Sequence, residues 1–361
     1  MDTAHNMKVT LHPVVSSTKV AAASVPMRAI VHRRYGTPDV LGFEEVARPV
    51  PGEEDVLVRV YAAGVSIGDH HVVTGKPYVI RLSPHCGVRR PLSQVPGMAL
   101  AGRVEAVGAK VTTVRPGDEV YGDASAGAFA EYAVVPAQRL APKPDNLSFE
   151  EAAATSWAVT PLQALRDVGR LEAGQKVLIN GASGGVGTWA IQIAKALGAE
   201  VTAVCSGRNA EMVRALGADA VVDYTKEDFV GGGARFDLVF DTVGNRTLSE
   251  FRKVLTPTGT YVSCGGGNSS LRWLFRMARA SLASLFTRQK LKTFIVTPSR
   301  TDLLALKVLV EAGKAKPFIE RRYALSETAD ALRHVGGGHV RGQVVIRVAD
   351  SQELRFQVVT Q

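Results

Sequence analysis

The sequence predicts an α/β protein in which a doubly wound parallel sheet is inserted in a β-rich, barrel-like domain. Short alternating stretches between residues 27 and 150, such as DVLVRVYAAGV and GAFAEYAVVP, are typical of half-buried strands separated by glycine turns. From Lys176 onward, strands, glycine turns and helices alternate, which is typical of a parallel sheet covered by helices. After about residue 297 a helix and late strands such as RGQVVIRV return to the first pattern.

These changes of pattern predict the domain limits. Residues 27–153 and 298–361 are expected to form the β-rich domain, and residues 154–297 the inserted domain. A first strand is expected from Met27. Residues 1–26 contain few acids and no arginine, so we expect a disordered tail or a start codon assigned too early, with a targeting segment as the alternative.

The composition limits the class of protein. A chain of 361 residues with 46% hydrophobic and 21% charged residues is typical of a globular protein with two domains. No apolar run is long enough to span a bilayer. Cys86, Cys205 and Cys264 are far apart in the sequence, which argues against a disulfide framework or a four-cysteine zinc site. A reducing compartment, the cytoplasm, is therefore predicted.

A helix start is predicted at SFEE. Ser148 is placed to accept the amide of Glu151, and the Glu151 carboxylate to reach back to Ser148, which is the pattern of a capping box.

The segment INGASGGVG follows the strand KVLIN and precedes an apolar helix. A dinucleotide-binding loop has glycine at its first, third and sixth positions, which are Ala182, Gly184 and Gly187 here. Gly184 would let the backbone approach a pyrophosphate, and Gly187 would let the helix pack on the strand. The helix N-terminus offers free amides to phosphate. We therefore predict a dinucleotide site that includes the intervening residues Ser183, Gly185 and Val186.

The end of the second strand of this domain indicates which dinucleotide binds. NAD-specific sites have a carboxylate there for the ribose hydroxyls. This chain has Ser206, Arg208 and Asn209 instead, and a guanidinium can pair with a 2′-phosphate. The sequence predicts NADPH, with a solvated surface role for Arg208 as the alternative.

Several motifs resemble the zinc-independent quinone oxidoreductases of the medium-chain dehydrogenase/reductase family. They are YGTPDVLGFEEVARPVPGEEDVLVRVYAAGVS, GAFAEYAVVP, INGASGGVGTWAIQIAKALGAEVTAVCS, LGADAVVDYTKEDF, FDLVFDTVGN and HVRGQVVI, and they extend from Met27 to about Val348. The resemblance implies a groES-like catalytic domain, a Rossmann domain, NADPH and a homodimer. An alanine at the first loop position is the usual form in this family.

The resemblance also assigns cofactor-binding roles to individual residues. It implies that Thr160 contacts the nicotinamide amide and that Tyr224 lies near the 2′-phosphate. It also implies that backbone groups flank the ribose and nicotinamide at Val243, Gly244, Cys264 and Gly265. Arg341 is expected near the cofactor-binding end of the returning chain. A helix hydroxyl bonded to its own backbone is the alternative for Thr160.

The zinc ligands of related alcohol dehydrogenases are absent. Their cysteine and histidine positions are Ser66 and Met98 in this chain, so no metal is predicted. Without a Lewis acid, hydride transfer is easiest to an acceptor that is already electron-poor, such as a quinone or an enone. Ser66, Asp69 and Tyr78 are the candidate residues of the substrate cleft, and none is a decisive proton donor.

A basic segment precedes the last part of the chain. Residues 251–301 contain no Asp or Glu, and LRWLFRMARASLASLF within residues 271–288 has an apolar face beside Arg272, Arg276 and Arg279. A helix packed beside the cleft or the dimer edge is one interpretation, and peripheral contact with an anionic membrane surface is the other. Nucleic acid is not an expected partner.

The sequence thus predicts an NADPH-dependent oxidoreductase with a small electrophilic acceptor. Two alternatives remain open at this point, an enoyl-thioester reductase and an NADPH-binding interaction or sensor protein with little turnover.

Overall fold

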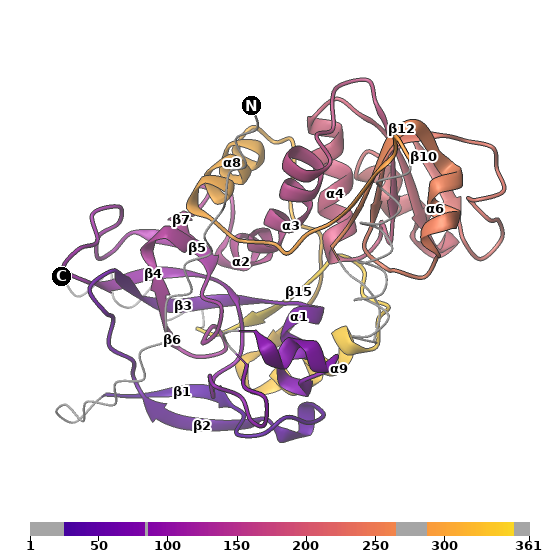
Figure 1. Ribbon diagram of the computed structural model, residues 1–361. Coiled ribbons are helices and arrows are strands. Elements are labelled where there is room, and N and C mark those ends of the chain that lie inside the picture. The colour runs from indigo at the N-terminus through magenta and orange to yellow at the C-terminus, as the bar shows by residue number, and fades with distance from the viewer. Residues whose placement is uncertain (1–24, 84–85, 265–286, 350–361) are drawn as a thin grey trace, which may run out of the picture.

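The computed structural model describes residues 25–83, 86–264 and 287–349. Its two lobes are built on separate sheets, one of six strands and one of seven. The first two strands of the chain form a further, two-stranded sheet. Figure 1 shows the parallel sheet with its helices in one lobe and the β-rich part in the other. The predicted fold class, a doubly wound parallel sheet inserted in a β-rich groES-like domain, is confirmed.

The six-stranded sheet is parallel throughout and has the order β10-β9-β8-β11-β12-β13. Its strands are rich in valine, leucine and phenylalanine because helices cover them. The strands are β8 Lys176–Asn180, β9 Glu200–Cys205, β10 Ala220–Asp223, β11 Phe236–Asp241, β12 Leu255–Ser263 and β13 Lys290–Thr293. The helices between them are α4 Gly185–Ala196, α5 Ala210–Ala215 and α6 Leu248–Val254.

The seven-stranded sheet is mostly antiparallel and has the order β14-β15-β3-β4-β5-β7, with β6 paired to β3. Its strands are β3 Asp55–Val65, β4 Ala99–Val107, β5 Glu119–Asp123, β6 Tyr132–Pro136, β7 Leu140–Pro142, β14 Ile319–Ala324 and β15 Gln343–Arg347. The two-stranded sheet consists of β1 Pro26–Val31 and β2 Gly42–Ala47, so the first strand begins one residue before the expected Met27.

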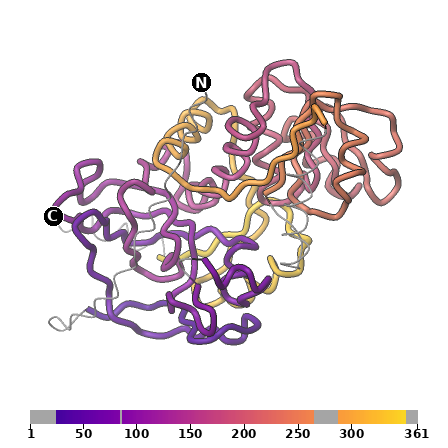
Figure 2. The backbone as a smooth tube through the Cα atoms, viewed as in Figure 1, coloured from indigo at the N-terminus to yellow at the C-terminus, as the bar shows by residue number. Residues whose placement is uncertain are grey.

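The remaining helices cover this sheet and join it to the parallel one. They are α1 Ile67–Thr74, α2 Phe149–Thr155, α3 Val159–Leu162, α8 Arg300–Glu311 and α9 Thr328–Gly336. Short 3-10 helices are η1 Pro38–Val40, η2 Tyr78–Leu82, η3 Ala137–Arg139, η4 Ser156–Ala158, η6 Gly207–Asn209 and η7 Leu325–Glu327. A π-helix, η5 Gln163–Val168, follows α3. In Figure 2 the yellow C-terminal part of the chain runs back among the purple segments of the β-rich lobe, where β15 pairs with β3.

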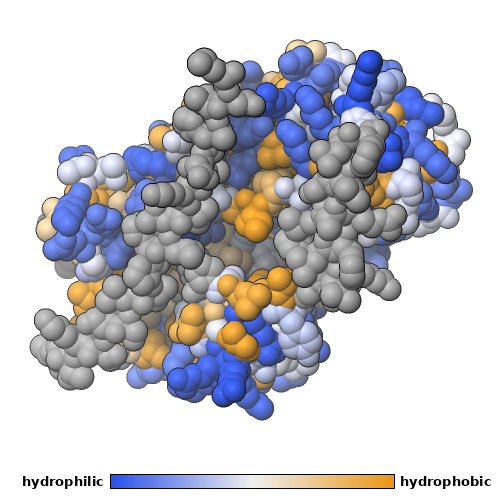
Figure 3. Space-filling model, viewed as in Figure 1, coloured by the Kyte–Doolittle hydropathy of each residue, from blue (hydrophilic) through white to orange (hydrophobic). Residues whose placement is uncertain are grey.

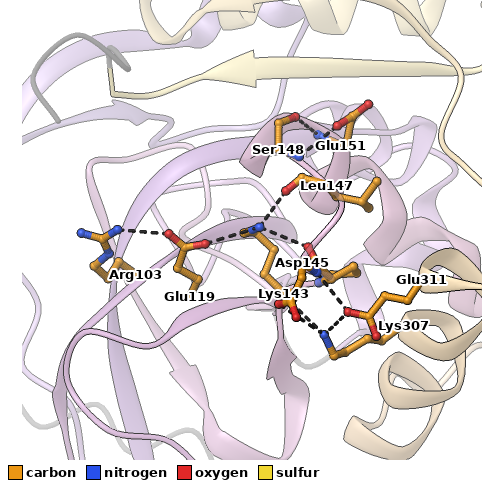
Figure 4. Close-up of polar contacts among 10 residues, drawn as sticks. Arg103, Glu119, Lys143, Asp145, Leu147, Ser148, Glu151, Lys307 and Glu311 are labelled. Atoms are coloured by element: carbon orange, nitrogen blue, oxygen red, sulfur yellow. Dashed lines mark hydrogen bonds and ion pairs between the residues drawn. The ribbon is translucent and has the colours of Figure 1, made fainter. Parts of the chain in front are cut away.

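The predicted capping box of α2 is confirmed. The Ser148 hydroxyl accepts from the Glu151 amide, and the Glu151 carboxylate accepts from the Ser148 amide at 2.9 Å. Figure 4 shows this cap above the nearly buried Lys143, whose ammonium donates to the Leu147 carbonyl at 2.6 Å. Lys307 of α8 donates to the Lys143 carbonyl at 3.2 Å, so α8 is fastened to the β-rich lobe beside α2.

One buried cluster spans both lobes, because it joins β8, α4 and the alanine-rich α2 to Ala62, Tyr121 and Val345 of the seven-stranded sheet. Another lies within the β-rich lobe and centres on β3, β4 and β15. On the face shown in Figure 3, apolar side chains also gather in the hollow between the lobes. None of the described helices is long and apolar enough to cross a membrane.

Parts of the predictions lie outside the described residues. They are residues 1–24 of the predicted tail, Gly265, and residues 271–286 of the basic segment. The domain limits stay a prediction.

A buried histidine gives a prediction about stability and pH. His32 is fully buried beside the Ser93 carbonyl, and burial lowers the pKa of its ring to about 4. The folded state therefore resists protonation of this ring. The contribution of neutral His32 to the unfolding free energy is fully present above the ordinary pKa of 6.5 and is lost as the pH falls towards 4. We expect the wild type to lose about 2 kcal/mol more unfolding free energy between pH 7.5 and pH 5 than His32→Gln does. Urea denaturation at both pH values measures this, and an equal loss in both proteins would contradict it.

Candidate active site

The loop between β8 and α4 is the centre of the site. Asn180 ends β8, and Gly184 is the N-cap of α4 with no side-chain cap on the free amides. A Cβ on Gly187 would lie 2.2 Å from the Gly181 carbonyl oxygen, so only glycine fits where the helix meets the loop. A Cβ on Gly184 would meet only that oxygen, at 3.6 Å, so the described structure leaves open space there. The loop thus has the shape of a phosphate cradle at a helix N-terminus.

The returning chain closes over this loop. The Gly342 amide donates to the Ser183 carbonyl at 2.9 Å, and the Gln343 side chain donates to the Gly185 carbonyl at 2.7 Å. Arg341 is therefore brought beside the loop, and its buried Nε has no partner among the described residues. The sequence did not indicate Gln343, because nothing local shows that the first residue of β15 reaches α4.

The neighbouring strand β11 ends in a buried carboxylate. Asp241 Oδ1 accepts from the amides of Val243 and Gly244 at 3.1 and 3.0 Å and from the Asn180 side chain at 2.9 Å. These bonds hold the predicted Val243 and Gly244 at the end of β8. Asp241 and Asn180 were missed, although polar residues at the carboxyl ends of adjacent parallel strands are a recognisable signal of a site.

Cys264 lies directly after β12. Burial raises the pKa of its thiol to about 12, so the thiol stays protonated at neutral pH.

The predicted 2′-phosphate residues gather at the ends of β9 and β10. These strands are paired in register at Cys205 and Asp223, so Ser206 and Tyr224 follow neighbouring positions. Asn209 is buried and donates to the Ser206 hydroxyl at 3.2 Å. Arg208 in η6 is exposed and has no ion pair with any described residue.

A carboxylate from the adjacent strand also lies here, which the sequence did not show. A Cβ on Gly207 would lie 2.3 Å from Asp223 Oδ2, and hydrogen bonds from Thr225 and the Gly207 amide hold the pKa of Asp223 below its usual range. Its Oδ1 accepts from the Thr225 amide and hydroxyl at 3.1 and 2.7 Å. Asp223 therefore fixes the turn that carries Arg208.

Thr160 lies at the second position of α3, which packs against α4. Its side chain is half-buried.

The candidate cleft residues reach the same place from β3. Val344 of β15 pairs with Val65, so Ser66 comes next to Gln343 and hence to the loop. Asp69 is 1% exposed, and its carboxylate accepts from Ser66 and from the Met98 amide. Tyr78 in η2 is separate from this pair. It is 64% exposed, with the Arg81 guanidinium 4.8 Å from its ring centroid.

Within residues 25–83, 86–264 and 287–349, no group of three or more His, Cys, Asp or Glu residues is placed to hold a metal ion.

Comparison with known proteins agrees with this geometry. The family model described as the alcohol dehydrogenase GroES-like domain matches residues 52–145, and the one described as zinc-binding dehydrogenase matches residues 216–346. The 2-methylene-furan-3-one reductase of Solanum lycopersicum is 33% identical over 361 aligned residues, which cover 92% of this chain and 84% of the relative. The chain belongs to the quinone oxidoreductase group of the medium-chain dehydrogenase/reductase family.

Other members of the family are similar over nearly the same length. The chloroplastic NADPH-dependent alkenal/one oxidoreductase of Arabidopsis thaliana is 32% identical, with 90% of this chain and 81% of the relative covered. The solved structure of the quinone oxidoreductase from Coxiella burnetii has a TM-score of 0.79 and 29% identity, and the match covers 90% of this chain and all of that one. The predicted family resemblance is therefore confirmed.

Proposed function

We propose that this protein is an NADPH-dependent reductase that transfers a hydride to a quinone or an α,β-unsaturated carbonyl compound without zinc. The open space over Gly184 at the uncapped N-terminus of α4 is the observation that carries the proposal. Two similar proteins support it, since one is named as an NADPH-dependent alkenal/one oxidoreductase and the other as a quinone oxidoreductase.

The residues of the site divide between the two ends of the cofactor. Bound NADPH would supply the hydride. In this proposal the loop 182–187 lines the pyrophosphate, and the free amides at the start of α4, those of Gly185, Val186 and Gly187, donate to it. The residues proposed for the 2′-phosphate end are Ser206, Arg208, Asn209 and Tyr224. The set proposed for the ribose and nicotinamide is Thr160, Val243, Gly244, Cys264 and Arg341, with Gly265 added from the family resemblance alone.

The residues on the acceptor side favour an acceptor that needs no metal. Ser66 offers a hydroxyl and Met98 a thioether, neither of which is a usual zinc ligand. The Ser66 hydroxyl donates to Asp69 Oδ2 at 2.9 Å, so it is oriented away from a role as a free proton donor. The site therefore holds and orients an electron-poor acceptor, and solvent supplies the proton.

A screen of acceptors tests this function. NADPH oxidation at 340 nm is measured with quinones, enones and enals, and with enoyl thioesters. We expect turnover with the first two classes. Preference for thioesters would support an enoyl-thioester reductase instead, and tight NADPH binding without turnover would support a sensor protein.

The choice of NADPH over NADH gives a second prediction. Arg208→Ala should raise the NADPH dissociation constant about 10- to 100-fold, because a charge-assisted bond is worth about 1.5–3 kcal/mol, and should leave NADH within twofold. Fluorescence titration with both nucleotides measures this. Arg214→Ala, an exposed arginine on α5, is the matched control. Equal weakening of both nucleotides would contradict the assignment.

We further propose a cytoplasmic homodimer. Strand β13 is an edge strand of the parallel sheet, and a second copy would cover its open side. Two similar proteins are named as chloroplastic or mitochondrial, so the compartment needs direct localisation. Contact of residues 271–288 with anionic membranes is a separate proposal, which sedimentation with anionic liposomes tests.

A further inference from the structure

Asp69 joins two segments that are far apart in the sequence. Its Oδ2 accepts from the Ser66 amide and hydroxyl at 2.8 and 2.9 Å, and its Oδ1 accepts from the Met98 amide at 3.1 Å. Ser66 lies between β3 and α1, and Met98 directly precedes β4. The carboxylate thus ties the start of α1 to the start of β4.

Helix capping alone does not require this bridge. Ser66 and Asp69 form a capping box at the start of α1, and the capping boxes Ser148–Glu151 and Thr247–Glu250 cap α2 and α6 in the same way. The carboxylates of Glu151 and Glu250 are bonded to residues no more than four positions away in the described structure. The bond from Asp69 to Met98 instead spans 29 positions. The buried carboxylate at this cap therefore does something that the other two do not.

Burial makes this arrangement costly without its donors. Desolvation raises the pKa of Asp69 to about 7, and the bonds from Ser66 and Met98 oppose that rise. A buried carboxylate is tolerated only when hydrogen bonds satisfy it. Loss of the hydrogen bonds from Ser66 or from Met98 would therefore disturb both the start of α1 and the start of β4.

The two segments that Asp69 joins border the proposed acceptor site. Ser66 lies next to Gln343, which is bonded to the glycine loop. The Met98 side chain lies on the first turn of α1, where a Cβ on Gly68 would be only 2.9 Å from its Cε. Met98 thus fills the volume above Gly68, and its position depends on the amide that Asp69 holds.

We propose that Asp69 is a positioning residue that fixes Ser66 and Met98 as the two walls of the acceptor site and so sets the size of acceptor admitted. This inference rests on the proposed reductase function. Asp69 has no contact with the acceptor itself, since its carboxylate is buried and bonded to the two walls.

The test compares acceptors of two sizes. Asp69→Asn keeps the shape but replaces one accepting oxygen with an NH2 group, so one wall loses its tie. We expect the kcat/KM ratio of but-3-en-2-one to 9,10-phenanthrenequinone to fall about tenfold, while the NADPH dissociation constant stays within twofold. Glu151→Gln is the matched control, because it alters a capping box at the surface of α2 and should leave the ratio unchanged.

A second variant covers a failure of Asp69→Asn to fold. Met98→Ala removes the wall directly and should lower the same ratio. An unchanged ratio in folded Asp69→Asn would overturn the inference, and so would an unchanged ratio in Met98→Ala if Asp69→Asn does not fold. A rise in the NADPH dissociation constant as large as the fall in the ratio would also overturn it. A wild-type protein that binds NADPH but reduces neither acceptor would instead contradict the proposed function, and the acceptor site with it.

Discussion

Gly184→Ala is expected to fold like the wild type and to lose NADPH binding. Its Cβ would meet only the Gly181 carbonyl oxygen, at an ordinary contact distance of 3.6 Å, so the protein without cofactor has room for it. The methyl group would occupy the space that the pyrophosphate needs at the helix N-terminus. We expect the NADPH dissociation constant to rise at least about 100-fold, equal to about 2.7 kcal/mol, with the melting temperature within 2 °C.

Calorimetric titration with NADPH and thermal unfolding without it measure the two effects separately. Gly313→Ala would be a poor control because Gly313 has a positive φ of 68°. Gly232 is better matched, because nothing described lies within 4 Å of its Cβ position and no positive φ constrains it. Retained NADPH affinity in Gly184→Ala would mean that the loop is not the pyrophosphate site.

Gly187→Ala, unlike Gly184→Ala, is expected to destabilise the protein even without cofactor. Its Cβ would lie 2.2 Å from the Gly181 carbonyl oxygen and 2.6 Å from two Ala182 backbone atoms, and backbone cannot move aside as a flexible side chain can. Overpacking of this kind costs about 3 kcal/mol of unfolding free energy, and α4 must shift from β8 to relieve it. NADPH binding is lost as a consequence.

Urea denaturation of the cofactor-free protein measures this loss, with Gly184→Ala as the matched control three positions away. A Gly187→Ala protein as stable as the wild type would show that α4 does not depend on close contact with the loop. The two glycines therefore separate the ligand role of the loop from its packing role.

The sequence was sufficient for the features that depend on local pattern. The loop, the individual strands and helices of the parallel sheet and the α2 capping box are each encoded in a short stretch of chain, and the structure has them where they were expected. Alternation of apolar residues and glycine spacing indicate such features directly.

The contacts that complete the site depend on residues distant in sequence. Gln343 reaches Gly185 across 158 positions, and Asp223 lies against Gly207 only because β9 and β10 are neighbours. Asp69 was expected as a cleft residue, but its inward position follows from a bond to Met98 that no local pattern shows. Strand order and side-chain direction, which set these contacts, are properties of the assembled sheets.

Transfer of a labelled hydride tests the central claim most directly. NADPH that carries deuterium at both hydrogens of the nicotinamide C4 is incubated with the protein and but-3-en-2-one, and the product is analysed by mass spectrometry and NMR. We predict one deuterium on the former β-carbon of the product, in proportion to the NADPH consumed. Consumption of NADPH without deuterium at that carbon, or no consumption with any enone or quinone, would contradict the assignment as a hydride-transferring reductase.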